Sequence, residues 1–313
     1  MDVELPMKLL DWIDKDKIDF MGLSSNNSLE AIKMLKENPD KINWGYLSKN
    51  TSLEAIQILR ENPDKINWAY LSENVNAIQL LRENLNNIHW NYLSLNVNAT
   101  QLLKSNPDKI NWDYLSENSN AMDLLKSNPD KINWDYLSLN TSSEAIQLLK
   151  ENTNKIDWSY LSSNSNAIQL LKENPDKICW VWVTFNINAI QIIKENLDKL
   201  TKISWDYLST NTSLNAIQIL RENMDKIITI TDIYYLSTNI NAIDLLKEYP
   251  DKIDWIELSR NPNIFTYNYD KMRENMLLFK EDLMKERFHP RNLRKFGSWG
   301  HSGGIDEDDD DNE

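Results

Sequence analysis

Residues 128–140 read Asn-Pro-Asp-Lys-Ile-Asn-Trp-Asp-Tyr-Leu-Ser-Leu-Asn, and Ala-Ile-Gln-Leu-Leu-Lys follows at residues 145–150. Variants of these two phrases recur along nearly the whole chain at intervals of 22 to 28 residues. The Trp position of the first phrase falls at Phe20, Trp44, Trp68, Trp90, Trp112, Trp134, Trp158, Trp180, Trp205, Ile233 and Trp255. A period of this length is typical of stacked repeats, in which each unit contacts only its neighbours. The sequence therefore predicts one repeat array and not a globular enzyme.

Each repeat is predicted to contain two short helices. Residues 121–125 carry apolar side chains with helical period, and Asn120 precedes them as an expected N-cap. Pro129 ends this helix, because proline disfavours helical geometry in the residue before it. Asn133 is expected to cap a second helix that begins at Trp134. Helices of two turns are not stable alone in water, so stacking between repeats must hold them together.

These features favour an all-α fold, a right-handed α-solenoid of ten to eleven 22–24-residue two-helix repeats with capping helices. The nine tryptophans of the pattern are expected to form the core between repeats, so Trp134→Ala should cost ~3–5 kcal/mol. A leucine-rich-repeat-like α/β horseshoe is the alternative, because Ile-x-Trp-x-Tyr alternates with period two. Against it, only three or four residues separate Leu-Ser-x-Asn from the next helix. The segment also has few β-branched residues.

Linker length explains most of the variation in spacing. The linker Asn-x-Asn-Ala gives a period of 22, and the longer Asn-Thr-Ser-x-Glu-Ala adds two residues. The longer form places Thr51 and Glu54 at capping-box spacing. Two insertions, at residues 199–201 and 228–232, are expected to lengthen a loop at one edge of the array.

The ends of the chain depart from the repeat and suggest four segments. Residues 1–19 are expected to form an N-terminal cap with an amphipathic helix around residues 9–13, since a terminal repeat has one face in water. Residues 20–260 are the predicted repeat solenoid. Residues 261–300 are interpreted as a C-terminal capping helix with a basic and aromatic segment, and residues 301–313 as a disordered acidic tail.

The C-terminal helix is expected at about residues 270–287 and carries a stripe of apolar side chains. The stripe comprises Met272, Met276, Phe279, Leu283 and Met284. A stripe at this spacing is expected to seal the last repeat. A surface for a partner helix is the alternative.

The charge distribution bears on nucleic-acid binding. Of the net charge of −14, residues 306–313 carry seven acidic side chains, so the remaining 305 residues carry about −7. An acidic body argues against general nucleic-acid binding, which needs a basic face. The basic cluster near the C-terminus could contact RNA, because aromatic residues interleave with it, or could dock on the acidic body. Its members are Arg287, Arg291, Arg294 and Lys295.

No pattern of catalytic residues is present. The three histidines have no metal-ligand spacing, and no glycine-rich phosphate loop lies in the repeats. No enzyme activity, cofactor or metal is therefore expected. Cys179 is the single cysteine and cannot form an internal disulfide. With no secretory signal and no membrane span, the protein is expected in the cytoplasm.

One position of the first helix is polar in almost every repeat. It holds Gln57, Gln79, Gln101, Gln147, Gln169, Gln191 and Gln218. Stacking would align these side chains into a row, which could be a hydrogen-bond ladder between repeats or a face that binds a peptide.

The repeated phrase at residues 38–50, 62–74 and 128–140 resembles the tandem-repeat proteins of giant DNA viruses of amoebae. The opening Leu-Leu-Asp-Trp-Ile at residues 9–13 and the closing Asn-Pro-x-Ile-Phe and His-Pro-Arg-Asn share this resemblance. It covers roughly residues 5–300 and implies no catalytic residues. It implies a protein that acts in the infected cell or in the virion.

The predicted function is a non-enzymatic scaffold that binds a protein or an extended peptide along the Gln row and the insertion edge. A structural or packing role in the virion is the first alternative. RNA association through residues 287–299 is the second. The sequence does not specify the oligomeric state.

Overall fold

The computed structural model describes residues 5–228 and 234–287, and for Ile228, Leu278, Phe279, Glu286 and Arg287 it describes the backbone alone. The chain forms two compact units. The larger is Leu9–Phe265, and the smaller joins Met1–Lys8 to Thr266–Glu313. Helices predominate among the described residues, where the only strands are β1 (Met7–Leu9) and β2 (Phe265–Tyr267). The all-α repeat fold is therefore confirmed, and the α/β horseshoe is not supported.

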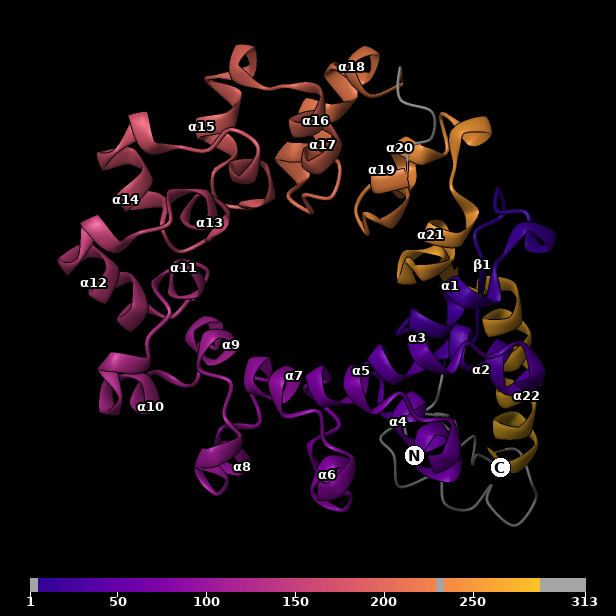
Figure 1. The fold of residues 1–313 in the computed structure, drawn as a ribbon. Helices are drawn as coiled ribbons and strands as arrows, with labels where there is room; N and C mark the ends of the chain where they lie inside the picture. The colour runs from indigo at the N-terminus through magenta and orange to yellow at the C-terminus, as the bar shows by residue number, and fades with distance from the viewer. Residues whose placement is uncertain (1–4, 229–233, 288–313) are drawn as a thin grey trace, which may run out of the picture. The chain divides into compact units, whose positions relative to one another are not determined.

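One short helix of each repeat lies on the inner side of the larger unit, and successive inner helices pack on one another (Figure 1). Most of them begin at the Trp position of the repeat. The inner elements are α1 (Phe20–Ser25), α3 (Trp44–Lys49), α5 (Trp68–Glu73), α7 (Trp90–Leu95), α9 (Trp112–Glu117), α11 (Trp134–Leu137), α13 (Trp158–Ser163), a 3-10 helix (Trp182–Phe185), α16 (Lys202–Leu208), α19 (Tyr234–Thr238) and α21 (Trp255–Arg260).

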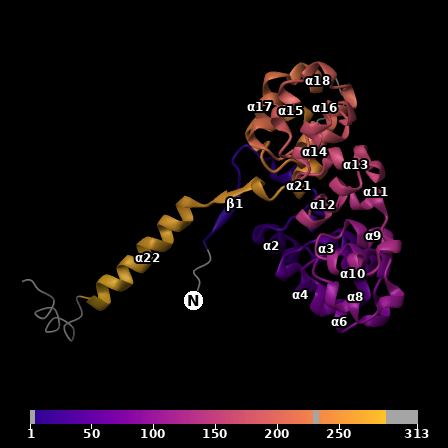
Figure 2. The same cartoon turned by 90° about the vertical axis from the view of Figure 1, so that its left-hand side faces the viewer.

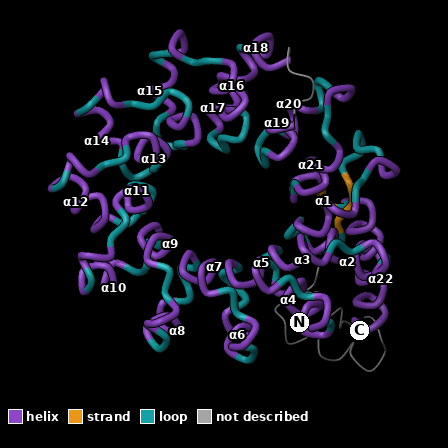
Figure 3. The backbone as a smooth tube through the Cα atoms, viewed as in Figure 1, coloured by secondary structure: helices purple, strands orange, loops and turns teal. Residues whose placement is uncertain are grey.

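The second helix of most repeats lies on the outer side (Figure 3). The outer helices are α2 (Leu29–Glu37), α4 (Leu53–Glu61), α6 (Ile78–Arg82), α8 (Thr100–Lys104), α10 (Met122–Ser127), α12 (Ser143–Glu151), α14 (Ile168–Glu173), α15 (Ile190–Lys194), α17 (Leu214–Glu222) and α20 (Ile243–Leu246).

A 3-10 turn follows each outer helix, mostly at Pro-Asp-Lys, where proline suits the first helical position. These turns are Pro39–Lys41, Pro63–Lys65, Leu85–Asn87, Pro107–Lys109, Pro129–Lys131, Thr153–Lys155, Pro175–Lys177, Leu197–Lys199 and Pro250–Lys252, with α18 (Met224–Ile228) in the equivalent place after α17. Further 3-10 turns lie at Lys15–Lys17 and Pro262–Ile264.

Side-chain caps set the start of most inner helices. Asn133 Oδ1 accepts hydrogen bonds from the backbone N–H groups of Asp135 and Tyr136 at 3.1 and 3.3 Å, which confirms it as an N-cap. Asn120 has a different role from the one predicted. Its Nδ2 donates to the carbonyl of Val97 in the preceding repeat at 3.0 Å, so it links repeats instead of capping its own helix.

The predicted capping box of the longer linker is also wrong. Ser52, and not Thr51, is the N-cap of α4, and its Oγ accepts a hydrogen bond from Ala55 N–H at 3.2 Å. The reason is that Asn50 Oδ1 accepts hydrogen bonds from both the N–H and the Oγ of Ser52, which turns the chain one residue later.

The core lies between the inner and outer helices. The Leu that follows each Tyr of the repeat is fully buried wherever it occurs, as at Leu137 with 0% exposure. The tryptophans at the Trp position are half-buried, except for Trp205 at 5% exposure. The predicted Trp core is thus a Leu core, with most Trp rings at its margin.

A ladder of buried Asn side chains joins the repeats. Asn118, the C-cap of α9, is 1% exposed, and its Nδ2 donates to the carbonyls of Ser94 at 2.9 Å and Asn96 at 3.1 Å in the preceding repeat. Its Oδ1 accepts the N–H of Asn120 at 3.0 Å. The same pair of donated bonds is made by Asn26, Asn50, Asn74, Asn96, Asn140, Asn164, Asn186 and Asn239.

The ladder does not stop at the first repeat, because α1 packs directly on α21. Asn26 Nδ2 donates to the carbonyls of Ser259 at 2.9 Å and Asn261 at 3.0 Å. These are the bonds that Asn50 makes to Ser24 and Asn26, so the last repeat stands where a preceding repeat would stand. The larger unit is therefore a closed ring of repeats (Figures 1 and 3). The expectation that the first repeat turns one face to water is wrong.

The two repeats that meet at this closure differ from the others two residues after the Trp position. Gly22 replaces the usual Tyr in the first repeat, and a Cβ atom there would lie 2.2 Å from the Ile256 carbonyl oxygen. Glu257 replaces it in the last repeat. Glu257 is 4% exposed, and its carboxylate lies 3.2 Å from Arg260 Nε. The closure is thus built from residues particular to these two repeats.

The start of the larger unit is not helical, contrary to the prediction for residues 9–13. Strand β1 extends to Leu9, and Leu10 N–H donates to the Ile264 carbonyl at 2.9 Å. The backbone of residues 7–10 pairs with residues that follow the last inner helix. These hydrogen bonds take the place of those that a helix at residues 9–13 would make. Ile13 is 7% exposed and belongs to the core.

The first insertion lengthens a helix and not a loop. Helix α16 begins at Lys202, three residues before Trp205, and Thr201 caps it in a capping box with Ser204. The second insertion begins at Ile228, the last residue of α18, and its residues 229–232 lie outside the described residues.

The smaller unit contains a long helix, α22 (Tyr269–Arg287), close to the predicted bounds (Figure 2). Asn268 N–H, just before it, donates to the Pro6 carbonyl at 2.8 Å. Met276, Leu283 and Met284 of its apolar stripe are 70%, 52% and 42% exposed, and the sealing of the last repeat by this stripe stays a prediction.

Candidate interaction surface

The inner helices present one repeated face. Counted from the Trp position, residues +1, +2 and +5 share a face, since residues three or four apart are neighbours on a helix. The Leu at +3 lies on the opposite face and is buried. Position +2 is aromatic in nine of the eleven repeats. Its residues are Tyr46, Tyr70, Tyr92, Tyr114, Tyr136, Tyr160, Trp182, Tyr207 and Tyr235.

The aromatic side chains of neighbouring repeats contact one another. The ring centroids of Tyr92 and Tyr114 lie 6.4 Å apart, and those of Tyr114 and Tyr136 lie 5.7 Å apart. The next two steps, to Tyr160 and then to Trp182, measure 6.3 and 6.0 Å. These distances are typical of aromatic pairs. Five different repeats thus form one continuous row of rings.

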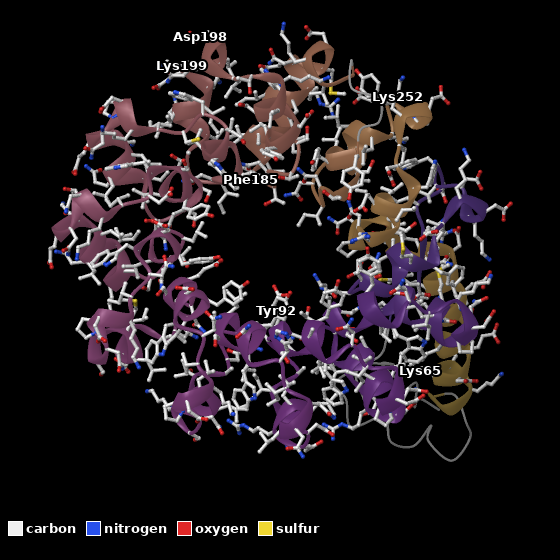
Figure 4. The ribbon with its side chains drawn as sticks, in the orientation of Figure 1. Lys65, Tyr92, Phe185, Asp198, Lys199 and Lys252 are labelled. Carbon is white, nitrogen blue, oxygen red and sulfur yellow. The ribbon has the colours of Figure 1, made fainter. Side chains whose placement is uncertain are left out.

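The row continues beyond Trp182. Its ring lies 5.7 Å from Phe185, Phe185 lies 4.7 Å from Tyr207, and Tyr207 lies 5.8 Å from Tyr235. Figure 4 shows Phe185 on the inner side of the larger unit and Lys65 on its outer rim. The row from Tyr92 to Tyr235, here called the aromatic row, therefore faces the centre of the ring of repeats.

The aromatic row is accessible. Its tyrosines are half-buried apart from Tyr235, which like Trp182 is 37% exposed. An extended chain can therefore reach these rings.

Carboxylates accompany the middle of the row. Asp113 and Asp135 occupy position +1, and Glu73 and Glu117 occupy position +5. Burial and the charge of Glu73 raise the pKa of Glu117 above its ordinary value. Asp113 Oδ1 also accepts a hydrogen bond from Asn133 Nδ2 at 2.8 Å.

Tyr136 lies among these groups. Burial raises the pKa of Tyr136, and so do the neighbouring Tyr114 and Tyr160 and the carboxylates of Asp113 and Glu117. The inner face of these repeats is thus both aromatic and negative.

Near the closure, the aromatic rings are covered by cations of the chain itself. The guanidinium carbon of Arg260 lies 4.3 Å from the ring centroid of Tyr46, and Lys49 Nζ lies 4.3 Å from that of Tyr70. From Tyr92 to Trp182, positions +1, +2 and +5 hold no Lys or Arg. Within the described part of the chain, no cation lies over those rings.

Some tryptophans of the repeat contact the neighbouring repeat through a lysine that lies over the indole ring. Lys155 Nζ lies 4.2 Å from the ring centroid of Trp134, and Lys131 Nζ lies 4.6 Å from that of Trp112. In each pair the lysine comes from the 3-10 turn before the next inner helix. At these two sites the lysine of the turn therefore covers the Trp of the preceding repeat.

The predicted Gln row lies on the exposed side of the outer helices and makes no ladder between repeats. Gln147 Nε2 donates to Glu151 Oε1 at 2.7 Å, one turn further along the same helix. The same i,i+4 bond is made by Gln57, Gln79, Gln169, Gln191 and Gln218, and Gln101 is exposed. The hydrogen-bond ladder between repeats is made by asparagines instead.

The other predicted site residues do not join the aromatic row. Arg291, Arg294 and Lys295 lie outside the described residues, as does the side chain of Arg287. Cys179 is half-buried. The described residues contain no group of three His, Cys, Asp or Glu side chains suited to a metal ion. No described helix has the length and apolar composition that crossing a bilayer requires.

No family model matches this sequence, and no curated protein or solved structure matches it. The resemblance to giant-virus repeat proteins therefore rests on the quoted residues alone.

The aromatic row was missed as a candidate surface, although the repeat contains the signal for it. The Tyr at position +2 recurs almost as regularly as the Trp. A periodic aromatic residue is expected in the core. The sequence does not show whether the Trp or the Tyr of each repeat faces the centre of the ring of repeats. Closure of the ring decides this.

Proposed function

We propose that this protein is a non-enzymatic scaffold that binds a segment of a partner protein on the inner face of its repeats. The aromatic row carries this proposal. Tyr, Trp and Phe are enriched in protein interfaces, Tyr and Trp are frequent among the residues that contribute most to binding, and a continuous accessible row of them has no role in the Leu core. The Gln row is a weaker candidate, because most of its side chains already bond within their own helices.

A comparison of two matched double variants tests this proposal. Tyr114→Ala with Tyr136→Ala removes two neighbouring rings of the inner face. Gln147→Ala with Gln169→Ala removes two side chains of the outer face. Proteins captured from cell lysate by each variant and by the unaltered chain would be quantified by mass spectrometry, after thermal melting has shown that both variants fold.

Loss of one stoichiometric partner in the inner variant alone is the expected outcome. Loss in the outer variant alone would place binding on the Gln row. If all three forms capture the same proteins in equal amounts, the inner face is not the binding surface. Recovery of no specific partner by any form would favour a structural role.

A further inference from the structure

We propose that the arc from Tyr92 to Trp182 binds an extended peptide that carries Lys or Arg at alternate positions. This inference rests on the proposed function and specifies the chemistry of the partner. The arc consists of five aromatic rings at position +2 together with Asp113, Glu117 and Asp135.

The first argument is the contrast between the arc and the rest of the inner face. Arg260 covers Tyr46 and Lys49 covers Tyr70, each at 4.3 Å, so the chain itself places cations on rings of this series. The arc presents the same rings without a Lys or Arg on the shared face. A partner's cations can take the equivalent positions over these rings.

The second argument is charge. The charged residues on the shared face of the arc are carboxylates, and burial together with the charge of Glu73 raises the pKa of Glu117. A cation bound beside Glu117 offsets the repulsion between the carboxylates of Glu117 and Glu73 and pairs with Glu117. Nucleic acid carries the opposite charge and would be repelled.

The third argument is spacing. Consecutive ring centroids in the arc lie 6.4, 5.7, 6.3 and 6.0 Å apart. Side chains on one face of an extended chain recur every second residue, at about 6.6 Å. An extended peptide can therefore place one side chain on each successive ring. A helix repeats its face once per turn, about 5.4 Å, which is shorter than each of these four distances, so a helical peptide falls out of step along the arc.

Calorimetric titration of the full chain with synthetic peptides tests this inference. Five rings at two residues per ring correspond to a peptide of about ten residues. One peptide alternates Lys and Ser, a second has the same composition with all Lys in one block, and a third alternates Glu and Ser. We expect the alternating Lys peptide to bind at least about tenfold more tightly than the block peptide, and the Glu peptide not to bind.

Two triple variants with equal changes in net charge provide the control. Asp113→Asn, Glu117→Gln and Asp135→Asn neutralise the arc, and Glu151→Gln, Glu173→Gln and Glu222→Gln neutralise the outer face. The first is expected to weaken binding of the alternating Lys peptide about tenfold and the second less than about twofold. Melting curves identify any variant that does not fold. For the arc, Tyr114→Leu is then the substitute, because it removes the ring and keeps an apolar side chain.

Equal binding of the alternating and block peptides, or equal losses in the two triple variants, would overturn the inference by showing unspecific attraction. The inference also fails, while the proposed function stands, if no Lys peptide binds but Tyr114→Ala with Tyr136→Ala still loses its captured partner. A captured partner that binds the arc through a proline-rich segment would likewise overturn the inference alone.

Discussion

At the scale of the residue, buried asparagines align the repeats. Most inner helices are followed at their C-terminal end by an Asn whose amide reaches two carbonyls of the preceding repeat, as Asn118 does with Ser94 and Asn96. A buried carbonyl without a partner destabilises the fold by more than an average hydrogen bond stabilises it, because it has lost its hydrogen bonds to water and has no donor in the protein. The Asn of the repeat is therefore a linking residue as well as a C-cap.

Asn118→Ala is expected to lower the free energy of unfolding by about 2–4 kcal/mol, since it removes two buried hydrogen bonds and leaves the Ser94 carbonyl without a donor, whereas the Asn96 carbonyl keeps its bond from Ala99 N–H. Urea denaturation of the full chain measures this. The matched control is Asn120→Ala, which removes one bond from an exposed side chain and should cost less than about 1 kcal/mol. Equal losses for the two variants would contradict the linking role.

Glu117 gives a prediction with a defined pH dependence. Its folded-state pKa is raised, by burial first and by Glu73 second. Between its unfolded and folded pKa values the folded state holds more protons, so its contribution to stability falls as pH rises through that window. Glu117→Gln should therefore raise the urea midpoint at pH 7 by a small amount, because the site is only partly buried. The gain should vanish below about pH 4. A gain that persists in acid, or a lower midpoint at pH 7, would contradict the sign.

At the scale of the element, no helix of a repeat is long enough to be stable by itself. Helix α11 spans Trp134–Leu137, and α4, among the longest in the ring, spans Leu53–Glu61. Isolated helices of this length do not form in water, so packing between layers supplies their stability. The apolar residue between the layers should then matter more than the residue at the margin.

Leu137→Ala is therefore expected to cost more than Trp134→Ala, although Trp is the larger side chain. Leu137 is fully buried, and its truncation should cost about 3–4 kcal/mol. The ring of Trp134 is half-buried under Lys155, so its truncation should cost about 2 kcal/mol, less than the sequence alone predicts. Urea denaturation of both variants gives the order, and a larger loss for Trp134→Ala would restore the Trp rings to the core.

At the scale of the larger unit, closure replaces caps. A repeat array normally needs polar terminal repeats, because each end exposes an apolar face. Here the end faces of α1 and α21 bury each other. Gly22 permits the close approach, since any Cβ there would meet the Ile256 carbonyl at 2.2 Å and Ser259 Cβ at 2.7 Å.

Gly22→Ala is expected to open this closure. The added methyl meets backbone, which cannot move aside as a flexible side chain can. X-ray scattering should then show a larger radius of gyration, and amide exchange should be faster around Asn26. Gly45→Ala is the control at the +1 position of the next repeat, where the nearest atom to a new Cβ is 3.4 Å away. It should keep the native scattering curve and be neutral or slightly stabilising, because Ala is the better helix former. Identical scattering from both variants would show that closure does not depend on Gly22.

Several features of this fold follow from the sequence by itself. The period, the two helices of each repeat and the turn at Pro-Asp-Lys are local, because apolar spacing, Asn caps and proline act over a few residues. The long C-terminal helix is local for the same reason. For this reason the all-α repeat fold and Asn133 as a cap could be predicted.

Only the tertiary structure decided which surfaces are free. Whether an array closes depends on the small rotation between repeats summed over all of them, and no local pattern records that sum. Closure placed the tyrosines around an opening, removed the expected N-terminal helix by pairing Leu10 with Ile264, and left the Gln row on the outside. The replacement of Tyr by Gly22 and Glu257 at the two ends is the one sign of closure in the sequence. Its meaning depends on a contact between residues more than 200 positions apart.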